Sequence, residues 1–199
     1  MMDKEIRYFE SELRGAEDGR EIHGTAVVFN KRSQALGWFV EIIDPRAFDN
    51  CDMTDVIACR NHDPDKVMAR TGSNTLTLEV NDGGVDYRFE APNTTVGNDT
   101  LEDIKVGNIN KSSFAFTIKS DKWEEQEDGT DLRTILEINK LYDVSPVTNP
   151  AYLQTDVSTN EVAKRSHEAW KEENKPEEKE TPTDTLSVRE AEQILIEIN

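Results

Sequence analysis

Residues 75–91, TLTLEVNDGGVDYRFEA, form two segments of alternating residue type on either side of a turn sequence. Alternation with a period of two places every second side chain on the same face of a β-strand. The apolar side chains that share a face in each segment are Leu76, Leu78, Val80, Val85, Tyr87 and Phe89. The intervening residues 81–84, NDGG, suit a tight turn between antiparallel strands. This stretch predicts a β-hairpin and indicates a β-rich fold.

The chain around this hairpin contains further short segments that are rich in β-branched and aromatic residues and are separated by Gly, Pro, Asn and Asp. These segments are 22–29, 38–43, 55–62, 111–119 and 132–147. Acidic residues in 124–131 predict a solvated hairpin loop between the last two segments. Residues 95–110 instead follow a helical period. We predict a short helix there, with Asn98 or Asp99 as its N-cap and Gly107 at its end.

The composition divides the chain into a domain and an appendage. Residues 1–157 predict a single mainly β domain with peripheral helices. Residues 158–186 are dense in Glu and Lys and have almost no apolar side chains, which predicts a charged flexible linker. Residues 187–199 regain helical spacing, which predicts a short amphipathic helix that docks on a partner.

Charge and cysteine content exclude several classes of function. The 199-residue chain carries 41 Asp and Glu against 23 Lys and Arg, for a formal net charge of −18. This charge repels phosphate groups, so we expect neither a nucleic-acid nor a membrane partner. Only Cys51 and Cys59 occur, which argues against a disulfide framework or a structural zinc site. Residues 1–15 lack the apolar run of a signal peptide, so we expect a cytoplasmic protein or one that acts inside something assembled there.

Histidine is the most common general base near neutral pH, and the chain has 3 of them. His167 falls in the predicted linker and His23 at the start of a predicted strand, where a structural role is expected. His62 ends an apolar strand segment and precedes a polar turn, a placement that presents its imidazole at the rim of a sheet. Asp63 and Asp65 beside it leave a metal site as an alternative, although a turn explains them more simply.

Four side chains could act as the nucleophile beside His62. Cys59 is three residues before His62 on the same predicted strand, so the two side chains should point to opposite faces. Cys59 is therefore expected to be a buried inert thiol, and Cys51 a turn residue. Ser112 and Ser113 open the strand that follows the predicted helix, a position that turn chemistry alone could explain.

Several motifs in this order resemble the maturation proteases of tailed-bacteriophage proheads, whose fold is related to that of the herpesvirus assembly proteases. The motifs are HGTAVVFN (23–30), VEIIDPRAF (40–48), NHD (61–63), the hairpin strands of 75–91, GNINKSSFAF (107–116) and LYDVSPVTNPAY (141–152). Two positions depart from the family pattern, which often has Gly at Arg46 and Glu at Asp143. The second departure preserves a carboxylate on a shorter side chain.

The resemblance implies a serine peptidase in which His62 activates Ser113 and Asp143 orients the imidazole. The loop after Asp143 is the candidate for the oxyanion hole, with Asn149 and Ala151 as its donors. The resemblance implies no cofactor and no metal.

The resemblance also implies a closed β-barrel and a place of action in the host cytoplasm, inside the assembling procapsid. The expected substrates are segments of scaffold and of the major capsid protein, together with the protease itself. A homo-oligomer is compatible with this family. The alternative function is a noncatalytic capsid-assembly module on the same barrel. A hydrolase with a metal at His62, Asp63 and Asp65 is a third reading.

Overall fold

The computed structural model describes residues 4–9, 13–15, 19–148 and 157–175 of the chain. Its strands are β1 (Glu5–Phe9), β2 (Leu13–Gly15), β3 (Glu21–Val28), β4 (Phe39–Ile43), β5 (Ile57–Cys59), β6 (Val67–Arg70), β7 (Leu76–Asn81), β8 (Gly84–Glu90), β9 (Lys111–Glu125) and β10 (Asp131–Val147). Its helices are α1 (Thr95–Lys105), α2 (Val157–Glu173) and the short 3-10 turns η1 (Pro45–Phe48), η2 (Arg60–His62), η3 (Pro64–Lys66) and η4 (Thr71–Ser73). None of the helices described is long and apolar enough to cross a membrane.

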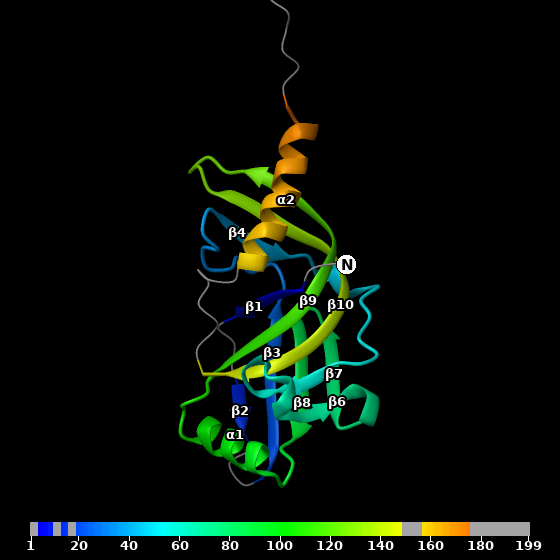
Figure 1. Ribbon diagram of the computed structural model, residues 1–199, viewed down its shortest axis with the longest axis vertical. Helices are drawn as coiled ribbons and strands as arrows, with labels where there is room; N and C mark the ends of the chain where they lie inside the picture. Colours follow the sequence, from blue (N-terminus) through cyan, green and yellow to red (C-terminus); the bar gives the residue numbers. More distant parts are fainter. Residues whose placement is uncertain (1–3, 10–12, 16–18, 149–156, 176–199) are drawn as a thin grey trace, which may run out of the picture.

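The described strands pair into two sheets. The larger has the order β1-β9-β10-β5-β6, with β4 also paired to β10, and the smaller has the order β2-β3-β8-β7. In Figure 1 β9 and β10 run diagonally through the molecule as long curved ribbons, with α2 against their upper part and α1 at the opposite end. The predicted mainly β architecture is confirmed. Among the described strands the pairings do not join the two sheets into one closed barrel.

The predicted hairpin is present as β7 and β8. Leu76 pairs with Phe89 and Val80 with Val85, so the apolar side chains of the two strands share a face. The side chain of Asn81 accepts hydrogen bonds from the N–H groups of the two glycines in the turn. A Cβ on Gly84 would lie 1.9 Å from the Val27 carbonyl oxygen, so only glycine lets β8 approach β3 this closely.

The predicted helix within 95–110 is α1, but its N-cap is Thr94 and not Asn98 or Asp99. The Thr94 side chain accepts a hydrogen bond from the N–H of Gly97. A Cβ at Gly97 would lie 2.1 Å from the Pro92 carbonyl oxygen, so this glycine lets the chain turn into the helix earlier than the apolar spacing indicated.

The main hydrophobic core joins both sheets and α1. Its fully buried side chains include Ile22, Val27, Val85, Phe114, Phe116, Ile135, Ile138 and Leu141. Leu101 and Ile104 of α1 pack against the same core. Burial of this apolar surface is the main contribution that holds β9 and β10 in place beneath the site described below.

Residues 158–173 of the predicted flexible linker belong to the helix α2. Ala163, His167 and Trp170 recur at helical spacing on one face, and Ala163 is fully buried in a second cluster with Trp123. The linker prediction counted how few apolar residues occur here and overlooked this spacing. The predicted terminal helix, 187–199, lies outside the described residues.

Candidate active site

The pairing of β9 with β10 places three polar side chains on one face of the larger sheet. Ser113 lies directly opposite Ser145, and Ala115 lies opposite Asp143. Directly paired residues share a face, and so do residues two apart on a strand, which brings Ser113, Ser145 and Asp143 together. The register shifts between Leu141 and Asp143, and an irregularity of this kind often aims a side chain into a functional site.

His62 reaches this face from a turn and not from the strand that we predicted for 55–62. Strand β5 ends at Cys59, and the η2 turn follows with φ of 53° at Asn61 and 59° at His62. Left-handed backbone is unfavourable for residues with a Cβ and costs about 1–3 kcal/mol each. Two consecutive residues of this kind indicate that the surrounding contacts hold the turn in place.

The imidazole of His62 joins the serine to the carboxylate. Its Nε2 lies 2.6 Å from Ser113 Oγ, and its Nδ1 lies 2.5 Å from Asp143 Oδ1. The side chain of His62 is 12% exposed and that of Asp143 is 3% exposed. The carboxylate is therefore shielded from water, while the imidazole lies at the border with solvent.

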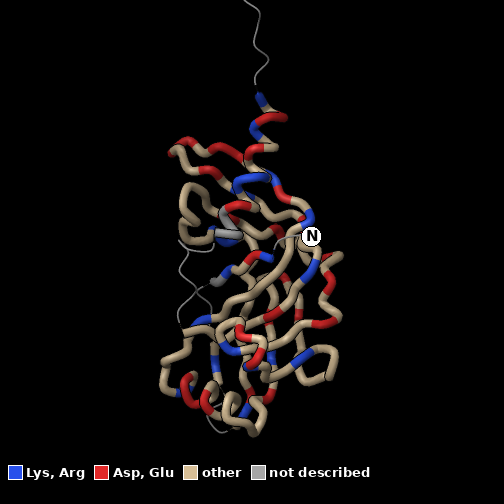
Figure 2. The backbone as a smooth tube through the Cα atoms, viewed as in Figure 1, with Lys and Arg blue, Asp and Glu red and all other residues tan. Residues whose placement is uncertain are grey.

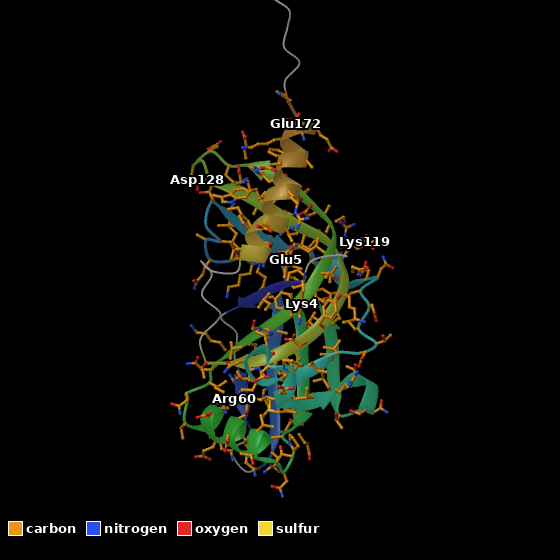
Figure 3. All side chains as sticks on the ribbon, viewed as in Figure 1. Lys4, Glu5, Arg60, Lys119, Asp128 and Glu172 are labelled. Atoms are coloured by element: carbon orange, nitrogen blue, oxygen red, sulfur yellow. The ribbon has the colours of Figure 1, made fainter. Side chains whose placement is uncertain are left out.

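Asp143 is ionised in this site despite its burial. Burial alone would raise the pKa of its carboxyl, but the hydrogen bond and charge of His62 and the ammonium of Lys4 outweigh it, so the pKa is lowered. Lys4 Nζ lies 3.0 Å from Asp143 Oδ2, the oxygen that His62 does not contact. Figure 3 labels Lys4 just before β1, near the middle of the molecule.

The part of the chain that contains His62, Ser113 and Asp143 matches a known protein family. The model of the family "Caudovirus prohead serine protease" matches residues 7–173, which include all three of these residues. The chain belongs to the caudovirus prohead serine protease family. The match confirms the resemblance that the sequence motifs indicated, and it extends through α2.

Two further comparisons accompany the family match. The capsid assembly protease gp21 of bacteriophage T4 has a solved structure that aligns with a TM-score of 0.45 and 12% identity, covering 73% of this chain and 97% of that chain. No curated protein sequence matches the chain.

In this prohead protease the two adjacent serines point to opposite faces of β9. Ser113 faces His62, and its Oγ also lies 2.8 Å from the Arg7 carbonyl oxygen, a second acceptor for its proton. Ser112 faces the core, where its hydroxyl lies 2.9 Å from the Tyr87 hydroxyl. The opposite orientation follows from the period of two along a strand.

Strand β1 pairs antiparallel with β9 beside Ser113, and buried charges connect it to further strands. Arg7 Nε lies 2.8 Å from Glu41 Oε1, and Arg7 Nη2 lies 2.6 Å from Glu5 Oε2. Arg133 contacts Glu5 at 3.1 Å and Asp121 at 2.6 Å. These five side chains connect β1 with β4, β9 and β10, and they reinforce the β1–β9 pairing that places the Arg7 carbonyl against Ser113.

The cysteines are not arranged as nucleophiles. Burial raises the pKa of both Cys51 and Cys59 to about 11, so both are protonated at neutral pH. Cys59 Sγ lies 3.3 Å from Ser145 Oγ, and Cys51 Sγ lies 3.8 Å from the Asp52 carbonyl oxygen.

The remaining candidates have other placements. His23 is exposed on β3. His167 is buried beside Trp123. Burial lowers the pKa of its imidazole, and the nearby charge of Asp131, which acts to raise this pKa, offsets the effect only in part. Asp63 caps the turn at Asp65 and pairs with Lys66 at 2.9 Å, and no group of metal-binding side chains occurs in the described part of the chain.

Sequence reasoning missed several members of the site. Ser145 stands in the VSP motif beside Asp143. Lys4 directly precedes β1 and Arg7 lies on it, and no local pattern connected this segment to the site. The predicted oxyanion donors, Asn149 and Ala151, lie outside the described residues.

Proposed function

We propose that this prohead protease is a serine endopeptidase in which Ser113 is the nucleophile, His62 the general base and Asp143 the orienting acid. The observation that carries the proposal is the continuous contact from Ser113 Oγ through both ring nitrogens of His62 to Asp143 Oδ1. The order nucleophile, base and acid in space is that of a serine protease triad, whatever their order along the chain.

The first chemical step moves one proton and forms one bond. Ser113 Oγ attacks the carbonyl carbon of the scissile peptide while its proton passes to Nε2 of His62. The imidazolium then gives this proton to the departing amine, the C–N bond breaks, and an acyl ester remains on Ser113. Water activated by His62 hydrolyses the ester and regenerates the serine.

The Ser113 hydroxyl has a single proton and faces two acceptors, His62 Nε2 and the Arg7 carbonyl. The attacking arrangement requires that this proton point toward Nε2. Asp143 accepts the Nδ1–H of His62, which selects the tautomer whose Nε2 is free to take it. Asn149 and Ala151 stay the proposed oxyanion donors, because they follow Asp143 closely in the sequence.

The substrates that we propose are extensions of the major capsid protein and scaffold, and the protease itself, cleaved inside the immature capsid within the host cytoplasm. Membership of the prohead protease family supports this setting. The net charge of −18 suits an enzyme that acts on protein and not on the genome. A homo-oligomer stays part of the proposal.

Labelling with a fluorophosphonate tests the proposal. We expect one adduct on the intact protein, mapped by mass spectrometry to Ser113, and no adduct in Ser113→Ala or in His62→Ala that is still folded. Full labelling of Ser112 would show that the register is wrong by one residue. A folded protein that takes no label would favour the noncatalytic assembly module, and peptidase activity that disappears with a chelator would favour the metal-dependent reading.

A further inference from the structure

Ser145 is a fourth polar side chain of the site, and it lies buried next to His62 and Asp143. It is 0% exposed, and its Oγ lies 3.0 Å from Asp143 Oδ1 and 3.3 Å from both the backbone N and Nδ1 of His62. We propose that Ser145 is a positioning residue of the protease, which joins the His62 turn to the Asp143 carboxylate. The proposal rests on the proposed function, because it assigns a role within the same triad.

The direction of each hydrogen bond follows from counting protons. An ionised carboxylate can only accept, so the single proton of Ser145 is donated to Asp143 Oδ1. The lone pairs of its oxygen then face the backbone N–H of His62 and the thiol of Cys59, both at 3.3 Å. The remaining contact, 3.3 Å to His62 Nδ1, carries no hydrogen bond in this arrangement because the Nδ1–H is donated to Asp143 Oδ1. The buried hydroxyl thus has its proton and both lone pairs partnered, and two of these partners belong to the triad residues Asp143 and His62.

Asp143 Oδ1 receives two donors, the Nδ1–H of His62 and the hydroxyl of Ser145. Lys4 holds the other oxygen, Oδ2, from a half-exposed side chain, and the fully buried Ser145 hydroxyl adds a second donor on Oδ1 that further restricts rotation of the carboxylate about its χ2 angle. The oxygen is therefore held in line with Nδ1 before substrate arrives.

The backbone of the His62 turn needs external support because Asn61 and His62 both adopt left-handed conformations. Strand β10 and the residue that follows it, Thr148, provide it at two points. Ser145 Oγ accepts from the N–H of His62, and the side chain of Asn61 accepts from the N–H of Thr148 at 3.1 Å. The same strand thus carries the acid and holds the turn that carries the base.

Removal of the Ser145 hydroxyl should weaken the support of both the Asp143 carboxylate and the His62 turn. The Ser145 side chain is fully buried, so its removal should not change contacts with the substrate. A displacement of the imidazole by about 1 Å can cost roughly a hundredfold in rate. We therefore expect Ser145→Ala to lower kcat for a peptide substrate by about 10- to 100-fold and to leave KM nearly unchanged. The rate of fluorophosphonate labelling of Ser113 should fall by a similar factor.

Ser112→Ala is the matched control. It removes a hydroxyl of equal burial from β9, whose partner is Tyr87 in the core. Both variants lose a fully buried hydroxyl, so a loss of activity through general destabilisation should appear in both. We expect the labelling rate to fall only in Ser145→Ala when the two are compared at equal fraction folded.

The NMR resonance of the His62 Nδ1–H gives a readout that packing alone would not move. We expect this resonance to lie far downfield in the intact protein, and to shift upfield and exchange faster with water in Ser145→Ala. Ser145→Cys keeps the size of the side chain with a weaker donor, and an intermediate labelling rate is expected. If Ser145→Ala does not fold, the labelling rate and the Nδ1–H resonance are measured in Ser145→Cys instead.

A labelling rate and Nδ1–H resonance equal to those of the intact protein in a folded Ser145 variant would overturn the positioning role. Failure of the proposed function has a different signature, since the intact protein would then take no label on Ser113.

Discussion

Asp143 keeps its charge in a buried position because three donors reach its carboxylate. Nδ1 of His62 and the Ser145 hydroxyl contact Oδ1, and Nζ of Lys4 contacts Oδ2.

The Asp143 carboxylate is an orienting group that neither attacks nor carries the proton. Asp143→Asn should therefore lower kcat by about 10³- to 10⁴-fold and leave measurable turnover, because the amide favours the wrong tautomer of His62. Asp143→Glu should lose about 10- to 100-fold, since the longer side chain displaces the carboxylate. Single-turnover peptide cleavage measures both, and normal turnover in Asp143→Asn would remove Asp143 from the site.

The pH dependence of protein stability tests independently whether Asp143 is ionised in the folded protein. The pKa of Asp143 is lower in the folded protein than in the unfolded chain, where it is about 4. Ionised Asp143 therefore contributes stability above pH 4, and this contribution is lost as the pH falls through the folded value. The difference in unfolding free energy between the intact protein and Asp143→Asn should shrink between pH 6 and pH 3.

The raised pKa values of the two cysteines predict their reactivity. With a pKa of about 11, Cys51 and Cys59 have a thiolate fraction of about 1 in 1000 at pH 8, against about 1 in 4 for an ordinary thiol. Iodoacetamide should therefore alkylate the folded protein at least about 100-fold more slowly than the denatured chain, as measured by mass spectrometry. Treated protein should still label at Ser113 with fluorophosphonate. Rapid alkylation that abolishes this labelling would reopen the assignment of the nucleophile.

At the scale of elements, α2 is part of the folded domain. The indole Nε1 of Trp123 donates to Ser166 Oγ at 3.0 Å, and Ser166 Oγ donates to Asp121 Oδ1 at 2.7 Å. A chain that ends after residue 175 should unfold like the full chain, whereas one that ends after 156 should lose about 3 kcal/mol or more, because it exposes the Trp123 cluster. Thermal unfolding of both truncations provides the comparison. Equal midpoints would return α2 to the role of an independent linker.

The buried charges around β1 are the second element-scale test. Arg133→Met leaves Glu5 and Glu41 with Arg7 as their remaining buried cation in this cluster, and breaking a buried ion pair costs about 3–5 kcal/mol. Lys119→Ala is the control, since Lys119 pairs with Glu137 on the surface and is labelled in Figure 3. Urea unfolding should show a large loss for the first variant and little for the second. Similar losses would mean that β1 is held by packing alone.

At the scale of the whole molecule, the net charge of −18 opposes the compact state. Figure 2 shows acidic residues gathered at the tip of the β9–β10 hairpin, whereas α2 carries both acidic and basic residues. Salt screens surface repulsion but reaches buried pairs poorly. The melting temperature should therefore rise by several degrees between about 20 mM and 300 mM NaCl. A fall in melting temperature would show that surface attractions outweigh the repulsion.

The local pattern of residues was sufficient for much of this protein. Alternation in 75–91 predicted a hairpin that the structure confirms, and the motif spacing indicated the family that the comparison confirms. The motifs also pointed to Ser113, His62 and Asp143, which the structure brings into contact. Such patterns succeed because side-chain periodicity depends on neighbours along the chain.

The rest depended on contacts between residues far apart in the chain. His62 and Asp143 are 81 positions apart. The left-handed turn at His62 is closed by the bond from the Asp63 N–H to the Arg60 carbonyl, and it is also supported by Ser145 of the distant strand β10. The docking of α2 likewise depends on Trp123 of β9, so its sparse apolar residues looked insufficient when they were counted alone. A backbone conformation or a buried charge that costs free energy locally is stable only with partners from distant strands, and these partners become neighbours when the sheet forms.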